Sequence, residues 1–168
     1  IETEIQQMID KPKKINPIEL ESVSWRAIAH LGGFRKHVSE TRNFHLDSKF
    51  KTIFTAEAGP DMQFHYQKFD EIVEVTKMMG KDQLKGEFRK GNRKPVPEHV
   101  AEYSFYNAKK ANCLFIAPEI HDSVVEDCFD YSCNKAPFIV KKQPIEFHIV
   151  PLTLEQFLKI FLVCIENK

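Results

Sequence analysis

The sequence predicts an α/β fold in which a mixed sheet, with an antiparallel hairpin and a set of parallel strands, is flanked by helices. Residues 61–66 and 71–76 are rich in alternating apolar side chains and are separated by a short polar connection, which predicts the hairpin. Residues 113–117 are five consecutive apolar residues, a pattern typical of a strand buried on both faces. Because helical segments separate the strands in the second half of the chain, these strands are expected to lie parallel.

Two helices are expected before the hairpin. Residues 1–10 place apolar side chains on one side of a short helix. Asn16 is the predicted N-cap of the second helix, Pro17 is its first residue, and a glycine pair at 32–33 is expected to end it. Residues 34–58 give mixed signals, and the possible core residues there are Phe44 and Leu46.

Helices and strands alternate after the hairpin. A further strand is expected over 145–149, where apolar residues alternate with polar ones. Thr153 followed by Gln156 is a capping box, which predicts the start of the last helix. The other helices expected in this part of the chain span 81–90, 96–108 and 122–131.

The composition is that of a globular chain of one domain. Of its 168 residues, 42% are hydrophobic and 29% are charged, and 24 Lys and Arg balance 24 Asp and Glu. Zero net charge excludes a protein that binds nucleic acid through bulk positive charge. No apolar run approaches the ~18 residues of a transmembrane helix and no signal peptide is visible, so no membrane association is expected.

The four cysteines form no C-x-x-C pair and are expected to be free thiols in a reducing compartment. Cys113 and Cys164 lie in apolar runs and are expected to be buried. Cys128 and Cys133 are expected to be packing residues.

The hairpin brings two acidic residues together. If Tyr66 lies opposite Glu71, then Asp61 lies opposite Thr76, and Asp61 and Glu74 are diagonal neighbours on one face, roughly 7–8 Å apart at the backbone. Paired carboxylates repel each other, but oxygen ligands suit a hard divalent cation such as Mg²⁺. Spacing alone also allows two solvated acids on an exposed face.

The residues around this pair resemble the PD-(D/E)XK nuclease motif. Pro60 and Asp61 are separated from Glu74-Val75-Thr76 by twelve intervening residues. Thr76 stands where the motif has a lysine. The candidates to replace that lysine are Lys77, Lys81 and Lys85.

The chain also resembles the AlwI-like branch of type IIS restriction endonucleases, which includes strand-nicking enzymes and their small partner subunits. Asp61, Glu74 and Glu87 follow one another at steps of 13 residues, as in that branch. The sequences PVPEHV (95–100), LFIAPEIH (114–121) and VPLTLEQF (150–157) are similar to later family motifs. The resemblance covers about residues 20–165. It implies that the predicted mixed sheet flanked by helices is a restriction-endonuclease fold.

The resemblance implies a metal centre formed by Asp61, Glu74 and the Val75 backbone carbonyl, with Mg²⁺ as the cofactor and Mn²⁺ as a substitute. Glu87 would be a further acid of the active site, and Glu21 would match an upstream glutamate of the family. The implied reaction is hydrolysis of phosphodiester bonds in double-stranded DNA, which leaves 5′-phosphate and 3′-hydroxyl ends.

Basic and imidazole side chains near these acids are further candidates. His99 could contact a phosphate or a water molecule, or could be a surface histidine of a helix. Lys85 is a candidate for the missing motif lysine. The basic residues of 81–94 could contact the DNA backbone, or could form the solvated face of a helix.

Type IIS enzymes normally add a separate recognition domain, and no helix-turn-helix or zinc module is evident in residues 1–168. We therefore expect these residues to form a single nuclease domain without a separate DNA-recognition domain. The chain resembles the small subunit of a heterodimeric type IIS enzyme, recruited by a large subunit that reads the site and nicks the other strand. The implied setting is a bacterial restriction-modification system in the cytoplasm.

Two other functions are compatible with the sequence. The chain could be a free-standing nuclease that homodimerises to cut both strands. It could also be a non-catalytic binding module that keeps the nuclease fold, and Thr76 is the residue that best supports this alternative.

Overall fold

The computed structural model describes residues 1–32, 38–40, 44–46, 52–55, 60–66, 69–89, 95–107, 110–133 and 137–167, with the side chains of 32–59 left out. The elements follow the chain as α1 (Glu2–Asp10), η1 (Pro12–Lys14), α2 (Pro17–Gly32), β1 (Val38–Glu40), β2 (Phe44–Leu46), β3 (Thr52–Thr55), β4 (Met62–His65), β5 (Asp70–Val75), α3 (Gly80–Gln83), η2 (Leu84–Phe88), α4 (Val96–Asn107), β6 (Ala111–Ala117), α5 (Asp122–Ser132), β7 (Phe138–Val140), β8 (Gln143–Ile145), β9 (His148–Thr153) and α6 (Leu154–Glu166).

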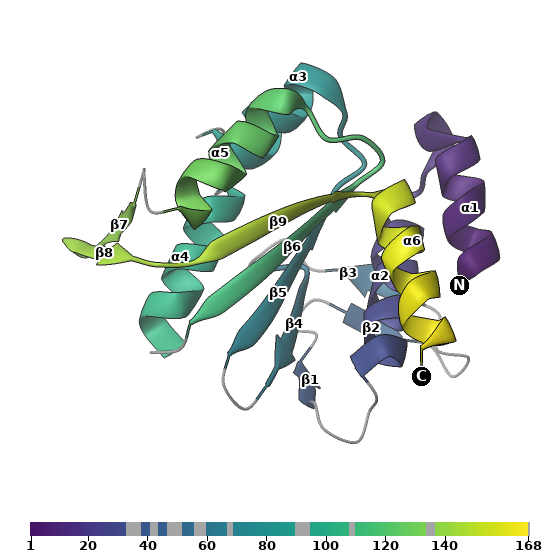
Figure 1. The fold of residues 1–168 in the computed structure, drawn as a ribbon, viewed down its shortest axis with the longest axis horizontal. Helices are drawn as coiled ribbons and strands as arrows, with labels where there is room; N and C mark the ends of the chain where they lie inside the picture. Colours follow the sequence, from purple (N-terminus) through teal and green to yellow (C-terminus); the bar gives the residue numbers. More distant parts are fainter. Residues whose placement is uncertain are drawn as a thin grey trace.

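The predicted mixed sheet is confirmed. Its five strands lie in the order β1-β4-β5-β6-β9. β4 pairs antiparallel with β1 and β5, whereas β5, β6 and β9 run parallel (Figure 1). Two small antiparallel ribbons, β2-β3 and β7-β8, lie outside this sheet. The carboxyl ends of the parallel strands meet at one edge, which is where ligands bind in open α/β sheets.

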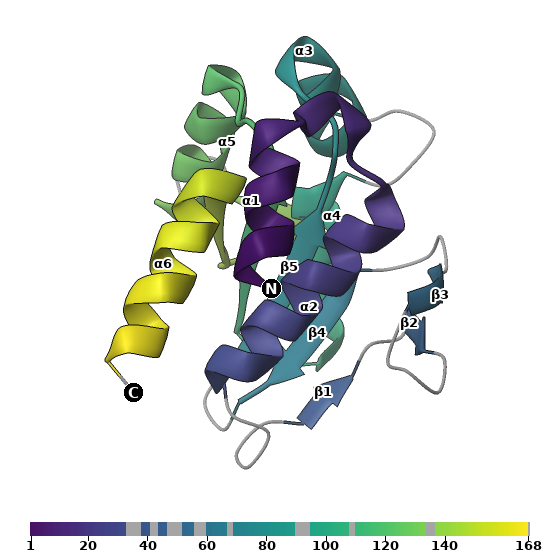
Figure 2. The same ribbon diagram turned by 90° about the vertical axis from the view of Figure 1, so that its right-hand side faces the viewer.

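Helices cover both faces of the sheet. On one face, α1, α2 and α6 pack against side chains such as Met62, Phe64 and Val73 (Figure 2). On the other face, α4 and α5 pack against a second core that includes Ile72 and Phe115. Alternate residues of β5 therefore face different helical layers, because successive side chains of a strand point to opposite sides. The position of a β5 side chain in the sequence thus decides which helices it meets.

The predicted helix ends agree with the structure. The Ile18 N–H donates to Asn16 Oδ1 at 3.0 Å, so Asn16 caps α2 as expected. Thr153 and Gln156 form the complete capping box at the start of α6. Phe44 and Leu46 lie in β2, but their side chains are outside the described residues. No helix in the described part of the chain is long and apolar enough to cross a membrane.

The strand expected over 145–149 and the burial expected of two cysteines are wrong. The strand expected over 145–149 is divided, because β8 ends at Ile145 and β9 begins at His148. All four cysteines are free, and Cys113 and Cys128 are buried, but Cys133 and Cys164 are exposed. Cys164 belongs to α6, whose buried side chains are Leu154, Phe157, Leu158 and Phe161.

Candidate active site

The hairpin connection is shorter than predicted. The Tyr66 N–H donates to the Phe69 carbonyl at 3.0 Å, and the register pairs Phe64 with Glu71. The predicted pairing of Tyr66 with Glu71 is therefore wrong by two residues. Because side chains alternate with a period of two, this slip leaves every side chain on its predicted face. The same register, continued by one pair, sets Asp61 directly opposite Glu74 instead of diagonal to it.

Asp61 lies immediately before β4 and is fastened to β5 by its own carboxylate. Asp61 Oδ2 accepts a hydrogen bond from the Val75 N–H at 2.7 Å. Burial raises the pKa of Asp61 well above its ordinary value, and the nearby charge of Glu74 raises it further. The two acids are thus close enough for each negative charge to oppose the other.

Glu74 is buried, with only 6% of its surface exposed. Its Oε1 is 3.0 Å from His99 Nδ1 on α4. Burial raises the pKa of Glu74 well above its ordinary value, with further contributions from the charges of Glu87 and Glu21. The alternative of two solvated acids on an exposed face is therefore wrong for Glu74, because α4 covers that face of β5.

Glu21 and Glu87 reach the same region from two other elements. Glu21 lies on α2, where burial raises its pKa to about 8 and the charge of Asp61 adds to the effect. Glu87 lies on η2 and raises the pKa of both Asp61 and Glu74. Four acidic residues, predicted from sequence to share a site, are therefore electrostatically coupled in the structure.

The donor set at this place suits a hard divalent cation. Asp61 and Glu74 offer carboxylate oxygens, and the Val75 carbonyl is the neighbouring backbone oxygen. Mg²⁺ keeps several waters, so one or two carboxylates can be enough to hold it. No three His, Cys, Asp or Glu side chains form a complete ligand cluster in the described part of the chain. The residues present fit a cation that completes its shell with water and substrate.

Thr76, at the position of the motif lysine, has a structural role. Its N–H donates to the Ile116 carbonyl at 3.0 Å, and its hydroxyl accepts from the Met78 N–H at 3.1 Å. Thr76 therefore continues the pairing of β5 with β6 and starts the following turn. Its side chain is neutral, so it cannot supply the positive charge that the motif lysine would place beside the acids.

None of the candidate lysines, Lys77, Lys81 and Lys85, is among the charges that shift the pKa of Asp61 or Glu74. Lys85 lies on η2 and is exposed, and in the described part of the chain no hydrogen bond or ion pair joins it to an acid of the site. The catalytic role expected for Lys85 stays a prediction. Within the basic run, Arg89 pairs with Asp127 at 3.0 Å. Lys90, Arg93 and Lys94 are outside the described residues.

Gln83 supports this edge of the sheet, a role that the sequence did not predict for it. It is fully buried, and its amide nitrogen donates to the Met78 and Glu119 carbonyls at 3.1 and 2.9 Å. Its carbonyl accepts from the His121 N–H at 3.0 Å. Gln83 thus joins the segments that follow β5 and β6. In the sequence it stands in a charged run and looks like a solvated residue.

Glu21 is expected to make the stability of the chain depend on pH. Its pKa in the folded state, about 8, exceeds the ordinary value of 4.5, so the folded state binds this proton more tightly than the unfolded state. The contribution of this proton to the free energy of unfolding is therefore fully present below about pH 4.5, and it is lost as the pH rises through about 8. After allowance for solvent screening, the decline is about 1 kcal/mol.

Thermal unfolding of Glu21→Gln, measured in EDTA, checks this expectation. The variant is expected to melt above the wild type at pH 8, and to lose this advantage at pH 4. Glu19→Gln, an exposed acid on the same helix, is the control. An equal difference from wild type at both pH values would contradict the assignment.

The mixed sheet between two helical layers is the fold of a restriction endonuclease subunit. The solved small subunit of the heterodimeric restriction endonuclease R.BspD6I matches 96% of this chain and 77% of its own, with a TM-score of 0.66 and 23% sequence identity. No curated protein matches the chain. The family model described as AlwI restriction endonuclease matches residues 2–160. The chain belongs to the AlwI restriction endonuclease family.

Proposed function

We propose that this chain is the DNA-cleaving small subunit of a heterodimeric type IIS restriction endonuclease. It hydrolyses one strand of duplex DNA and leaves 5′-phosphate and 3′-hydroxyl ends. Membership of a restriction endonuclease family supports the nuclease activity. The observation that carries the assignment of the site is the juxtaposition of Asp61 and Glu74 at the carboxyl end of β5.

Asp61, Glu74 and the Val75 carbonyl would hold Mg²⁺, for which Mn²⁺ would substitute. Bound there, the cation lowers the pKa of a water molecule and neutralises charge on the phosphate. The Val75 N–H fixes the Asp61 carboxylate, and His99 orients that of Glu74. Burial and mutual repulsion raise the pKa of both acids. A cation bound between them would offset this repulsion and would lower both pKa values, which favours the ionised carboxylates.

Other residues of the site act around this pair. Glu87 and Glu21 would strengthen the attraction of the site for a cation when they are ionised. His99 holds Glu74 in place through Nδ1. Lys85, exposed on η2, would supply the positive charge that Thr76 does not, and would approach the phosphate once DNA is bound.

We further propose that recognition of the DNA sequence resides in a large partner subunit and not in residues 1–168. The net charge of zero gives the chain a weak hold on DNA by itself. The solved structure that it resembles is a small subunit of a heterodimer, which supports the same division of labour. The bacterial cytoplasm is the compartment that such a restriction system implies.

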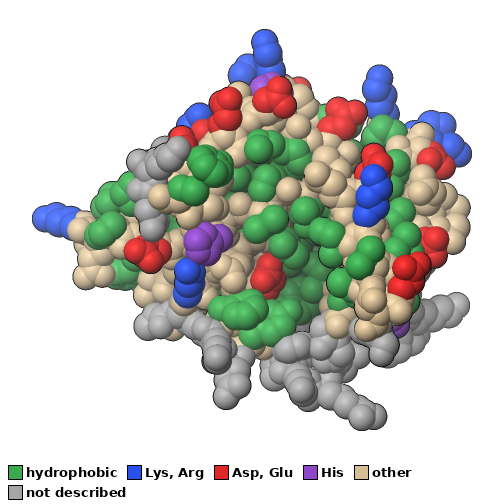
Figure 3. Space-filling view, viewed as in Figure 1, with side chains coloured by type: hydrophobic (Ala, Val, Ile, Leu, Met, Phe, Trp, Pro, Cys, Tyr) green, Lys and Arg blue, Asp and Glu red, His purple; other side chains and the backbone are tan. Residues whose placement is uncertain are grey.

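A hydrophobic surface supports the presence of this partner. Hydrophobic side chains gather in the middle of the face shown in Figure 3, and charged groups lie mostly around them. On α6, Ile160 is 45% and Val163 is 57% exposed, and Val150 of the neighbouring β9 is 45% exposed. Exposed apolar groups of this kind are common at subunit interfaces.

Cleavage of supercoiled plasmid with Mg²⁺ tests the proposal. The large subunit alone is expected to nick the plasmid, and the two subunits together are expected to linearise it. The small subunit alone should leave it largely intact. Linearisation by the small subunit alone would favour the free-standing homodimer, and nicking without linearisation by the complex would favour the non-catalytic module.

A further inference from the structure

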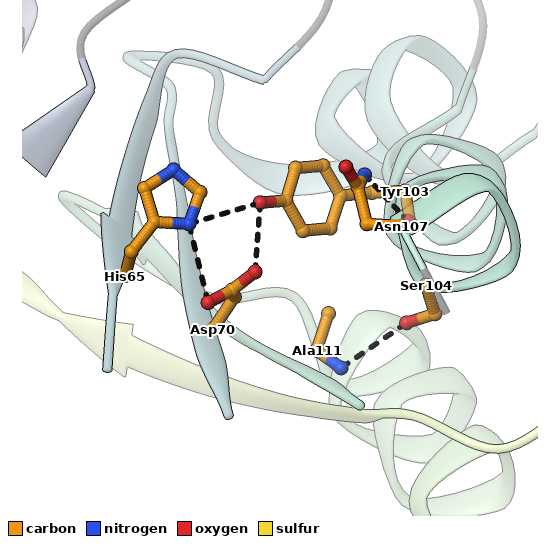
Figure 4. A network of polar contacts seen from close by, with 6 residues as sticks. All are labelled: His65, Asp70, Tyr103, Ser104, Asn107 and Ala111. Carbon is orange, nitrogen blue, oxygen red and sulfur yellow. Dashed lines mark hydrogen bonds and ion pairs between the residues drawn. The ribbon is translucent and has the colours of Figure 1, made fainter. Parts of the chain in front are cut away.

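Two pairs of side chains join β5 to α4, and only one of them belongs to the acidic site. The first pair is Glu74 with His99, at 3.0 Å. In the second, the Tyr103 hydroxyl donates to Asp70 Oδ2 at 2.9 Å (Figure 4). Asp70 and Glu74 are four residues apart on the strand, and His99 and Tyr103 are four residues apart on the helix.

Asp70 comes before Glu74 on β5, whereas its partner Tyr103 comes after His99 on α4, so the strand and the helix run antiparallel at these contacts. Four residues span about 13 Å along a strand and about 6 Å along a helix, so the two contacts lie well apart on both. Between them, Ile72 of β5 and Val100 of α4 are fully buried in the same core. A single contact would let the helix pivot on the sheet, whereas two contacts separated by a packed core fix its direction.

Asp70 makes the contact between β5 and α4 that lies farther from the acidic site. It is 2% exposed, and its Oδ1 is 3.2 Å from Nδ1 of His65, which is its cross-strand partner on β4. The Tyr103 hydroxyl is also 3.4 Å from His65 Nδ1 (Figure 4). The Asp70 N–H donates to the Lys110 carbonyl at 3.1 Å. One buried carboxylate thus connects β4, β5 and α4.

The following residue of α4 adds a further attachment. Ser104 Oγ accepts from the Ala111 N–H at 3.1 Å, which ties the helix to the first residue of β6 (Figure 4). Ser104 is 8% exposed. The carboxyl-terminal half of α4 is therefore attached to three strands, whereas the half that carries His99 makes the contact with Glu74.

We propose that Asp70 and Tyr103 are positioning residues for DNA cleavage, and that they orient α4 so that His99 stays against Glu74. The inference rests on the proposed function, because it assigns them an effect on cleavage. Misplacement of a catalytic group by about 1 Å can cost up to about 10²-fold in rate. Asp70 lies four residues before Glu74 on β5, about 13 Å along the strand, so the effect of this pair on cleavage is expected to pass through His99.

Tyr103→Phe tests the proposal, because it removes the hydroxyl and keeps the ring. In the assembled enzyme, single-turnover cleavage of the strand assigned to this subunit is expected to fall about tenfold, with unchanged affinity for DNA. Tyr106→Phe is the matched control, since Tyr106 lies on the same helix and is 61% exposed. Tyr103→Phe is expected to cause no further loss in a His99→Ala background, because both changes act on one contact.

The nuclear magnetic resonance of the His99 ring gives a readout that does not require cleavage. Tyr103→Phe and Asp70→Asn are expected to shift the His99 ring signals, and Tyr106→Phe is not. Unmoved signals in both test variants, or losses of cleavage that add to that of His99→Ala, would overturn the proposal. If the wild-type complex does not cut this strand, the proposed function fails, while the ring signals still decide whether Asp70 and Tyr103 position His99.

Discussion

Replacing Glu74 with Gln is expected to reduce cleavage of the strand assigned to this subunit by at least about 10²–10³-fold, with Asp61→Asn giving a loss of similar size. Each change removes a negative oxygen from the site that would hold the cation and keeps the shape of the side chain. Single-turnover cleavage by the complex with Mg²⁺ measures the effect. Asp82→Asn, at an exposed acid outside the site, should cut like the wild type.

Both variants are expected to fold, and this separates a loss of chemistry from a loss of structure. Glu74 is buried beside like charges, so its replacement by a neutral amide removes a cost from the folded state. The melting temperature at pH 8 is therefore expected to equal or exceed that of the wild type. Cleavage by Glu74→Gln at the wild-type rate would remove Glu74 from the active site.

Glu87→Gln and Glu21→Gln are expected to slow cleavage by about 10–10²-fold, a smaller loss than at Asp61 or Glu74. These acids act on the pair through their charge, and neither is proposed as a cation ligand. Removal of a nearby negative charge weakens the attraction of the site for Mg²⁺. A higher Mg²⁺ concentration should therefore recover part of the cleavage rate of these variants. Activity measured against Mg²⁺ concentration checks this.

The matched control for Glu21→Gln is an exposed acid on the same helix. Glu19 lies two residues from Glu21 on α2 and is exposed. Its replacement by Gln is expected to leave both the rate and its Mg²⁺ dependence unchanged. Equal losses for Glu19→Gln and Glu21→Gln would show that the surface charge of α2, and not the site, is responsible.

The face on which Asp61 and Glu74 lie was predictable from sequence, but their register was not. The alternation of residues in the hairpin decides the face, and a slip of two residues preserves it. The register depends on which residues close the turn, and the Tyr66–Phe69 hydrogen bond shows a tighter connection than expected. The acids are consequently closer partners than the prediction had them.

The burial of Glu74 could not be predicted from the strand alone. It results from α4, whose His99 meets Glu74 across 25 residues of sequence. The same holds for the buried Gln83, which binds residues 36 and 38 positions later. Each of these contacts is made by tertiary packing, and local polarity at these positions predicts solvent exposure instead.

The division between β8 and β9 was hidden by a pattern that continues across it. Ile145, Phe147 and Ile149 alternate with polar residues, yet Phe147 lies between the strands and is 2% exposed. The β7-β8 turn uses Lys141 and Lys142 at positive φ. Glycine or asparagine usually marks such a turn, so this one had no sequence signal.

Diffraction from crystals soaked in Mn²⁺, recorded for its anomalous signal, tests the central claim most directly. A peak is expected between Asp61 and Glu74, within coordination distance of a carboxylate oxygen of each and near the Val75 carbonyl. The peak should be absent in crystals of Glu74→Gln. A wild-type peak at other residues, or none in this place under saturating Mn²⁺, would contradict the assignment of a metal-dependent nuclease site.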